Sequence, residues 1–337
     1  MLQGESTLHG ATSERHEPSH PHLSLTPVVL DGLARQLQSA HVPEVGEALN
    51  TLIVRLGEAW RQGPDEAWRA TIERVRAHEV FTLMLQDPVT YRAFSKLRGY
   101  PGDADTLDTI YGLGVVHQDL AEASSIGRRL HVAARSTPSC RAVRNRCAVL
   151  ADVLQETLAR HAAPRIFCLA AGHLREADTI PWNMVEHLDL FLAADIDPKS
   201  VAAVAARGLH PRIEPRQLSL GALLKGRLDD DRFDLAYSTG LYDYLDERTA
   251  TALTHGLYGR LRPGGEVVIA NFASDARDIG YLEAIMDWSL TYRSEAQMRA
   301  LAPPGSLVRT WRDASQQVVF ASFQRPSSDR VQDAQGA

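Results

Sequence analysis

The sequence predicts an α/β fold: a doubly wound, mostly parallel seven-stranded sheet with an antiparallel last strand, preceded by an all-α N-terminal cap. Two observations lead to this fold class. From about 28 to 162, apolar residues such as Val45, Leu49 and Leu52 recur at three- and four-residue steps, which is helical periodicity. From residue 165, short apolar runs alternate with helical segments, a pattern typical of parallel sheets with right-handed crossovers.

Local signals place the individual elements. Two helix starts are indicated in the N-terminal half, at Pro64-Asp65 and at Thr137-Pro138. In the C-terminal half, strands are expected at residues 166–171, 188–195, 212–215, 233–239, 266–272, 306–313 and 316–325.

Helices are expected to follow Gly172 and to cover 198–207 and 247–261 between the strands. The last two strands are separated only by about two residues, Ala314 and Ser315, which permits a hairpin but no crossover helix. We therefore expect the last strand to be antiparallel, unlike the sheet of an ordinary dinucleotide-binding dehydrogenase.

The chain is expected to divide into four parts. Residues 1–24 are polar and are predicted to be a disordered tail. Residues 25–162 form the helical cap domain, 163–325 the α/β domain, and 326–337 a flexible tail.

Composition excludes several classes of function. The formal net charge of −6 argues against a nucleic-acid binder, and no apolar run approaches the ~20 residues of a membrane span. The N-terminus does not resemble a signal peptide. Three cysteines, odd in number and without a CxxC pair, favour reduced thiols in the cytoplasm, and no metal site is predicted.

In an open α/β sheet, ligands bind beyond the carboxyl ends of the strands. The first strand ends in a loop with Ala170 and Gly172, where a missing Cβ lets the backbone approach a ligand. The second ends at Asp195, 23 residues after Gly172, a position that suits hydrogen bonds to ribose hydroxyls. Asp197 competes for this role but is better explained as a helix N-cap.

The remaining strand ends supply further candidates. Apolar groups and a backbone N–H at Leu218 and Ser219 could hold an adenine ring. The fourth strand ends in STGLYDYLD, where Tyr242 and Asp243 are candidates for the reacting-group side and Asp246 for a helix cap. Before the fifth strand, Pro263, Gly264 and Gly265 are expected to form a tight turn, and Asn271 then falls at the ligand-facing end.

The loop around Gly172, ADIDP, the DLAYS strand and LRPGG together resemble the class I S-adenosylmethionine-dependent methyltransferases, over roughly residues 160–325. The chain departs from the family at the first motif, where Cys168 and AAGHL (170–174) stand in place of an acid and GxGxG. The resemblance implies S-adenosyl-L-methionine as the cofactor, bound by Ala170, Gly172, Asp195, Ile196, Leu218, Ser219, Ser238 and Thr239. A nicotinamide enzyme is disfavoured, because dinucleotide pyrophosphate needs the missing glycines.

A narrower resemblance involves RAFSKLRGYPGDADTLDTIYG (92–112), ARSTPSCRAVRNR (134–146) and MDWSLTYRS (286–294). These segments are similar to bacterial methyltransferases annotated for making a 3-hydroxypalmitic acid methyl ester. The implied activity is methyl transfer to a small-molecule acceptor, either a carboxylate or an O or N atom. For a hydroxyl or amine acceptor, Asp243 or a nearby tyrosine such as Tyr242 would handle the proton. The alternative is a degenerate methyltransferase fold that binds a nucleoside or scaffolds a partner.

The segment KLRGYPGDAD (96–105) is expected to lie over the cleft and to supply substrate contacts. Two glycines and a proline specify a defined turn, and Arg98, Tyr100 and Asp103 concentrate anion-binding, stacking and hydrogen-bonding groups there. The alternative is that Asp103 caps the next helix and Tyr100 packs in a core. The expected substrate-binding residues are Arg98, Tyr100, Asp103, Asn271, Tyr292 and Arg293.

Overall fold

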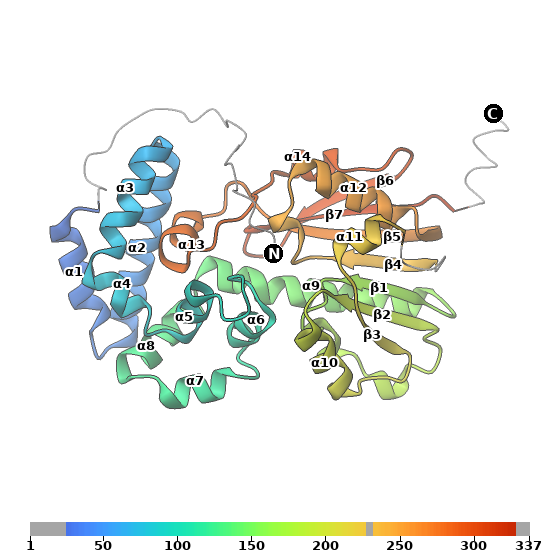
Figure 1. Cartoon of the computed structure of the whole chain (residues 1–337), viewed down its shortest axis with the longest axis horizontal. Helices are drawn as coiled ribbons and strands as arrows, with labels where there is room; N and C mark the ends of the chain where they lie inside the picture. Colours follow the sequence, from blue (N-terminus) through green and yellow to red (C-terminus); the bar gives the residue numbers. More distant parts are fainter. Residues whose placement is uncertain (1–24, 227–231, 328–337) are drawn as a thin grey trace.

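The computed structural model describes residues 25–226 and 232–327 (Figure 1). The predicted tail at 1–24 and nearly all of the one at 326–337 lie outside these residues. The N-terminal helices gather at one end of the molecule and the sheet at the other, with the long helix α9 running between them (Figure 1).

Helices fill the described chain up to the first strand, as predicted. Both predicted helix starts are confirmed: α3 begins at Asp65 after Pro64, and α9 begins at Pro138. At α9, Thr137 Oγ1 accepts a hydrogen bond from the Cys140 amide (3.4 Å). None of the helices in the described ranges is long and apolar enough to cross a bilayer. The helices before the first strand are α1 (Pro27–Leu37), α2 (Val42–Gln62), α3 (Asp65–Arg76), α4 (Glu79–Met84), α5 (Pro88–Ser95), α6 (Ala104–Tyr111), α7 (Val116–Glu122), α8 (Ser125–Ala134) and α9 (Pro138–Arg160).

The sheet confirms the predicted fold class. It has seven strands in the order β3-β2-β1-β4-β5-β7-β6. Neighbours among β1 to β5 are parallel, whereas β7 runs antiparallel to both β5 and β6. The strands are β1 (Arg165–Leu169), β2 (Leu190–Asp195), β3 (Ile213–Gln217), β4 (Phe233–Ser238), β5 (Leu261–Phe272), β6 (Leu307–Arg312) and β7 (Val318–Gln324).

The hairpin between β6 and β7 is confirmed, although its loop is longer than expected. Residues 313–317 separate the two strands. Buried Asp313 organises this loop, because its Oδ1 accepts hydrogen bonds from the amides of Gln317 and Val318 (2.9 Å each).

The helices expected at 198–207 and 247–261 are present as α10 (Pro198–Arg207) and α12 (Glu247–Tyr258). The prediction of a helix after Gly172 is wrong. Only two short 3-10 turns, η2 (Arg175–Thr179) and η3 (Trp182–Met184), follow β1. Leu174 has a left-handed backbone (φ +52°) directly before η2, so no helix continues from Gly172 through this residue.

The turn predicted at LRPGG is also wrong, because these residues belong to β5. Gly264 has φ +82°, and the pairing of β4 with β5 shifts register between Phe233 and Leu235. A Cβ at Gly265 would lie 2.9 Å from the Phe233 carbonyl oxygen, so only glycine fits this close approach. The glycine pair therefore forms an irregularity within the strand.

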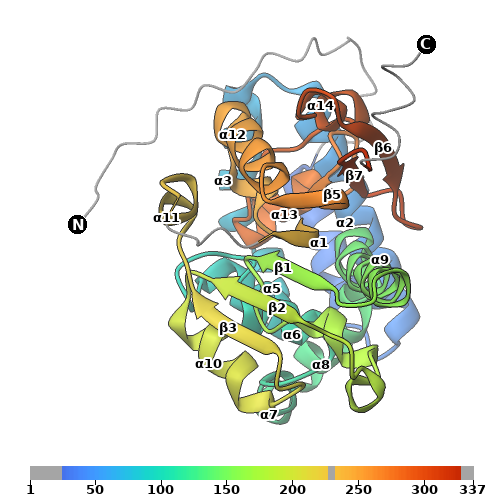
Figure 2. The ribbon, with the colours of Figure 1, turned by 90° about the vertical axis from the view of Figure 1, so that its right-hand side faces the viewer.

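The two faces of the sheet are buried in two cores. On one face, α11 (Leu220–Leu224), α12 and α14 (Glu295–Ala300) contribute to a core of their own. The other face shares a single core with the N-terminal helices, α9 and α13 (Ile279–Met286). Although α13 follows β5 in the chain, it packs against α2 (Figures 1 and 2). A Cβ at Gly280 would lie 2.3 Å from the Leu56 carbonyl oxygen, so the two helices are in very close contact.

Candidate functional site

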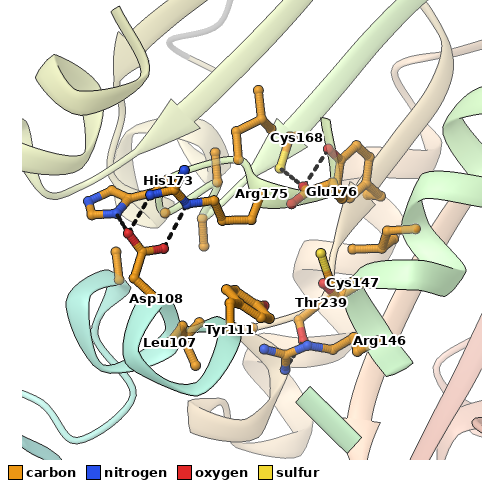
Figure 3. A pocket seen from close by; sticks show the side chains of 18 residues that line it. Leu107, Asp108, Tyr111, Arg146, Cys147, Cys168, His173, Arg175, Glu176 and Thr239 are labelled. Atoms are coloured by element: carbon orange, nitrogen blue, oxygen red, sulfur yellow. Dashed lines mark hydrogen bonds and ion pairs between the residues drawn. The ribbon is translucent and has the colours of Figure 1, made fainter. Parts of the chain in front are cut away.

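A pocket lies beyond the carboxyl ends of β1 and β4 (Figure 3). In the sheet, β2 lies on one side of β1 and β4 lies on its other side. The order of the strands therefore reverses between β1 and β4, where the pocket lies. The pocket contains about 520 Å³ of empty space, part of it open to solvent. The loop after β1 and the end of β4 form its floor, and α6 and α9 contribute Tyr111 and Arg146 to its walls.

The loop after β1 has an unusual backbone. Ala170, Gly172 and Leu174 all have left-handed conformations, with φ of +59°, +51° and +52°. These are the three positions of the expected GxGxG pattern, so the loop adopts a glycine-rich conformation with only one glycine. Left-handed backbone costs an L-residue roughly 1–2 kcal/mol, and such strain tends to persist at ligand sites. Ala170 and Gly172, both predicted to bind the cofactor, line the pocket.

Replacing Ala170 with glycine is expected to raise the free energy of unfolding by up to about 1 kcal/mol. Glycine adopts the left-handed conformation without steric cost, and this gain exceeds its extra entropy in the unfolded chain. Urea denaturation measures the change. Ala171 has no left-handed backbone, so Ala171→Gly should instead destabilise the protein. Equal destabilisation by both substitutions would show that position 170 stores no strain.

Asp195 ties the end of β2 to this loop. Its Oδ2 accepts a hydrogen bond from the Gly172 amide and its Oδ1 one from the Asp197 amide (2.8 Å each). Asp197 caps α10, as expected, by accepting a hydrogen bond from the Lys199 amide (2.9 Å). Between the two acids, the side chain of Ile196 is 63% exposed, which leaves an apolar surface beside the loop.

The ends of β3 and β4 carry the other residues predicted to bind a nucleoside. The Leu218 amide donates to the Asp195 carbonyl oxygen (2.9 Å), so the sheet already uses this N–H. Ser219 caps α11 through its hydroxyl. Ser238 is fully buried, and its hydroxyl has no partner within the described chain. Thr239 lines the pocket.

Tyr242, Asn271 and Arg293, predicted to act in catalysis or substrate binding, do not line the pocket. Tyr242 is fully buried, and its hydroxyl forms a hydrogen bond with the Thr254 hydroxyl (2.9 Å). Arg293, also buried, donates to the Tyr242 and Leu245 carbonyl oxygens (2.8 and 2.6 Å) and to Asn271 Oδ1 (2.6 Å). Apart from Arg293 Nε, which has no hydrogen-bond partner in the described chain and lies 3.6 Å from Glu247, protein partners take up the side-chain polar groups of these residues. The three residues brace the chain after β4 against β5.

Asp243 and Tyr292 also lie outside the pocket lining. Buried Asp243 accepts a hydrogen bond from the Phe272 amide (2.7 Å), and its other oxygen is 3.9 Å from Arg146 Nη1. Burial raises the pKa of Asp243 to about 6 although Arg146 opposes this shift. Tyr292 packs edge-on against Trp60 of α2, with ring centroids 6.1 Å apart.

The guanidinium of Arg98 is fully engaged by protein carboxylates. Its Nε and Nη2 donate to Asp105 (2.8 and 2.9 Å), and Nη1 donates to Asp197 (3.1 Å). Two acids thus already neutralise the charge of Arg98, for which an anion-binding role was predicted. Instead, Arg98 joins the turn at 96–105 to the end of β2.

Tyr100 and Asp103 lie close to the strand ends. Asp103 caps α6 by accepting a hydrogen bond from the Thr106 amide (2.9 Å), and its Oδ2 has no partner in the described chain. The ring of Tyr100 lies edge-on to Tyr244, with centroids 6.3 Å apart. Burial, followed by the charges of Asp195 and Asp103, raises the pKa of Tyr100 to about 12. The turn therefore lies against the ends of β2 and β4.

An ionic cluster that the sequence did not reveal joins α6 to the loop after β1. Asp108 of α6 accepts hydrogen bonds from His173 Nδ1 (2.8 Å) and from Nε and Nη2 of Arg175 (2.8 and 2.6 Å), as Figure 3 shows. Although burial opposes it, these bonds lower the pKa of Asp108 below its ordinary value. All three residues line the pocket, so the cluster fixes one of its walls.

Two buried charged residues in the pocket were also not predicted. Arg146 of α9 donates to the Thr239 carbonyl oxygen (2.7 Å). Glu176 of η2 accepts a hydrogen bond from the Tyr237 hydroxyl (2.7 Å), and the Cys168 thiol lies 4.0 Å from the same oxygen. Burial raises the pKa values of Glu176, Tyr237 and Cys168 above their ordinary values.

Comparison with known proteins supports the fold. No protein-family model matches the chain, and no curated protein matches it either. Among solved structures, a possible exported protein from Bordetella parapertussis is similar over 90% of this chain and 100% of its own, with 17% identity and a TM-score of 0.56.

Two methyltransferase structures also match part of the chain. Magnesium protoporphyrin IX methyltransferase from Synechocystis PCC 6803 is 12% identical over 55% of this chain and 85% of its own, with a TM-score of 0.43. The N-methyltransferase NodS from Bradyrhizobium japonicum WM9 is 16% identical over 55% of this chain and 88% of its own, with a TM-score of 0.38.

Proposed function

We propose that this protein is an S-adenosylmethionine-dependent methyltransferase acting on a small molecule. The observation that carries the proposal is the loop after β1, whose left-handed positions at 170, 172 and 174 line or adjoin a pocket at the switch point of the sheet. Maintaining left-handed alanine and leucine costs stability, and a ligand-binding role accounts for that cost.

Residues at the neighbouring strand ends fit this cofactor, although Asp195, Ile196 and Leu218 lie beside the pocket and not in its lining. Asp195 presents a buried carboxylate for the ribose hydroxyls, and Ile196 with Leu218 offers apolar surface for the adenine ring. The loop from Ala170 to Gly172 would approach the amino-acid end of the cofactor. Its single glycine also suits a ligand without phosphate, because no pyrophosphate has to be surrounded by backbone amides.

When bound, S-adenosylmethionine supplies an electrophilic methyl group on a sulfonium. The contribution of the protein would be to align the acceptor and to exclude water. Arg98 holds the turn at 96–105 on the end of β2, and Asp108 holds α6 on the loop after β1. These contacts support a role for the N-terminal helices as a cover over the pocket.

For the acceptor, we propose a carboxylate, as in methyl ester formation on a fatty or other small acid. A carboxylate attacks without losing a proton, so no general base is required. This agrees with the positions of Tyr242 and Asp243, the two proposed proton-handling residues, outside the pocket lining. A hydroxyl or amine of a secondary metabolite is the other acceptor class, and Asp243 would then be the base.

Asp243→Asn separates the two acceptor classes. For a carboxylate acceptor, we expect turnover to fall less than about tenfold, with no change in its pH profile above pH 6. For a hydroxyl or amine acceptor, the wild-type rate should rise with pH through about 6, where Asp243 loses its proton, and the variant should lose that rise. Steady-state rates between pH 5 and 8 provide the comparison.

The proposed function is tested by binding and then by turnover. Isothermal titration should show micromolar or tighter binding of S-adenosylhomocysteine and no binding of NAD. Incubation with methyl-labelled cofactor and a metabolite extract should then give a labelled small molecule, identified by mass spectrometry. Binding without any labelled product would favour the alternative of a nucleoside-binding or scaffold protein, and absence of binding would refute the methyltransferase.

A further inference from the structure

We propose that Glu176 binds the α-ammonium group at the amino-acid end of the ligand, so that this pocket selects ligands by that group. The inference rests on the proposed function, since it names a contact within the same site. It starts from the observation that Glu176 is a buried acid in the pocket wall and has no ion pair with a cationic side chain of the described residues.

Glu176 lies deep in the pocket wall. It is 9% exposed and belongs to η2, directly after the left-handed loop. Among the described residues, the side chains within hydrogen-bond distance of its carboxylate are the Tyr237 hydroxyl (2.7 Å) and the Cys168 thiol (4.0 Å). Both groups stay neutral, because burial raises their pKa values.

No cationic side chain in the described ranges lies within 4.0 Å of the Glu176 carboxylate, unlike the carboxylates of Asp105, Asp108 and Asp119. Arg146 and Arg207 act on Glu176 only at longer range. A buried carboxylate without a cation is unfavourable, and a cationic ligand that enters the pocket would remove this cost.

The surroundings favour an ammonium group over a metal ion. The described residues hold no cluster of three or more His, Cys, Asp or Glu side chains suited to a metal. An ammonium needs only acceptors for its three N–H donors, and one carboxylate supplies the charge. In Figure 3, Glu176 and Arg146 lie on different sides of the pocket. An acid and an arginine placed in this way complement a zwitterion, whose carboxylate would face Arg146.

This contact has a measurable consequence for ligand choice. S-adenosylhomocysteine carries the amino-acid end, whereas 5′-methylthioadenosine has the same nucleoside and sulfur but lacks it. We expect the wild-type protein to bind S-adenosylhomocysteine about 10- to 100-fold more tightly, the range for a charge-assisted hydrogen bond. Glu176→Gln should remove most of this preference and leave the affinity for 5′-methylthioadenosine within about twofold.

Isothermal titration of both ligands into the full-length wild-type, Glu176→Gln and Glu186→Gln proteins makes the test. Glu186 is exposed and lies ten residues further along the chain, so its variant controls for the change of charge. Melting curves report whether each variant is folded. The comparison of the two ligands on the wild-type protein needs no variant, so the inference stays testable even if Glu176→Gln does not fold.

The outcomes distinguish the inference from the proposed function. Loss of S-adenosylhomocysteine affinity alone in Glu176→Gln supports both. Unchanged affinity in that variant, an equal loss for both ligands, or equal binding of both ligands by the wild-type protein overturns the role of Glu176 and leaves the proposed function standing. Failure of the wild-type protein to bind either ligand overturns the proposed function, and the inference with it.

Discussion

Replacing Gly172 with valine is expected to weaken binding of S-adenosylhomocysteine by at least about 100-fold. Gly172 has φ +51° and lines the pocket, and a β-branched residue in this backbone region is a severe outlier. A Cβ at Gly172 would lie 3.6 Å from Ala104 Cβ, an ordinary contact, so the further methyl groups of valine would have to enter the pocket or displace α6. Isothermal titration measures the loss.

The strain of the substitution must be separated from its effect on the pocket. Gly208, at the end of α10, has φ +54°, and nothing lies within 4 Å of the Cβ it would gain. Gly208→Val therefore introduces a similar backbone strain at a site away from the pocket lining. Both variants should lose roughly 2 kcal/mol of stability, but only Gly172→Val should lose affinity. Equal loss of affinity in both would assign the effect to stability, and normal binding by Gly172→Val would exclude the loop from the site.

Asp108→Asn is expected to lower the free energy of unfolding by roughly 3 kcal/mol, because it removes the buried carboxylate that pairs with His173 and Arg175 and leaves Arg175 only its longer contact with Asp178 (3.5 Å). It should also weaken S-adenosylhomocysteine binding about tenfold, since the cluster holds a pocket wall. Urea denaturation and isothermal titration measure the two effects.

The same cluster gives stability a dependence on pH. The pKa of Asp108 is lowered in the folded protein, so its contribution is complete above its unfolded pKa of about 3.9 and is lost as pH falls through the lower folded value. As pH is lowered from about 4 to 2, the free energy of unfolding should therefore fall less in Asp108→Asn than in the wild-type protein.

A second substitution, at Asp119, controls for the loss of an ion pair in general. Asp119 makes a bidentate pair with Arg92 outside the pocket lining, and both side chains are partly exposed. Asp119→Asn should cost about 1 kcal/mol and leave binding unchanged. If Asp119→Asn weakens binding as much as Asp108→Asn does, the cluster has no specific role at the pocket.

The sheet could be predicted from the sequence because its signals are local. Runs of apolar residues mark the strands, and the short spacing after Arg312 requires a hairpin. The false helix after Gly172 has a physical origin. Arg175, Glu176 and Ala177 favour helices by propensity, but Leu174 is held in a left-handed conformation by the packing around it, and that outweighs propensity.

The side chains of the site were harder to predict. Arg146 did carry a signal, because it falls on the same helical face as buried Val143 and Leu150, where an apolar residue is expected. Glu176 carried none. It is buried by Tyr237 and Cys168, which arrive from two different strands, so only the assembled fold reveals its environment.

The core that one face of the sheet shares with the N-terminal helices limits how this protein can be divided or redesigned. A fragment beginning at β1 would expose the apolar residues of that face, together with α13, to water, and such a surface favours aggregation. The N-terminal helices therefore cannot be exchanged as a separate module. Grafting a different set of helices to change the range of acceptors would require repacking a core, including the close approach of Gly280 to Leu56. Changes of specificity should be sought through single substitutions in the turn at 96–105 and in α6.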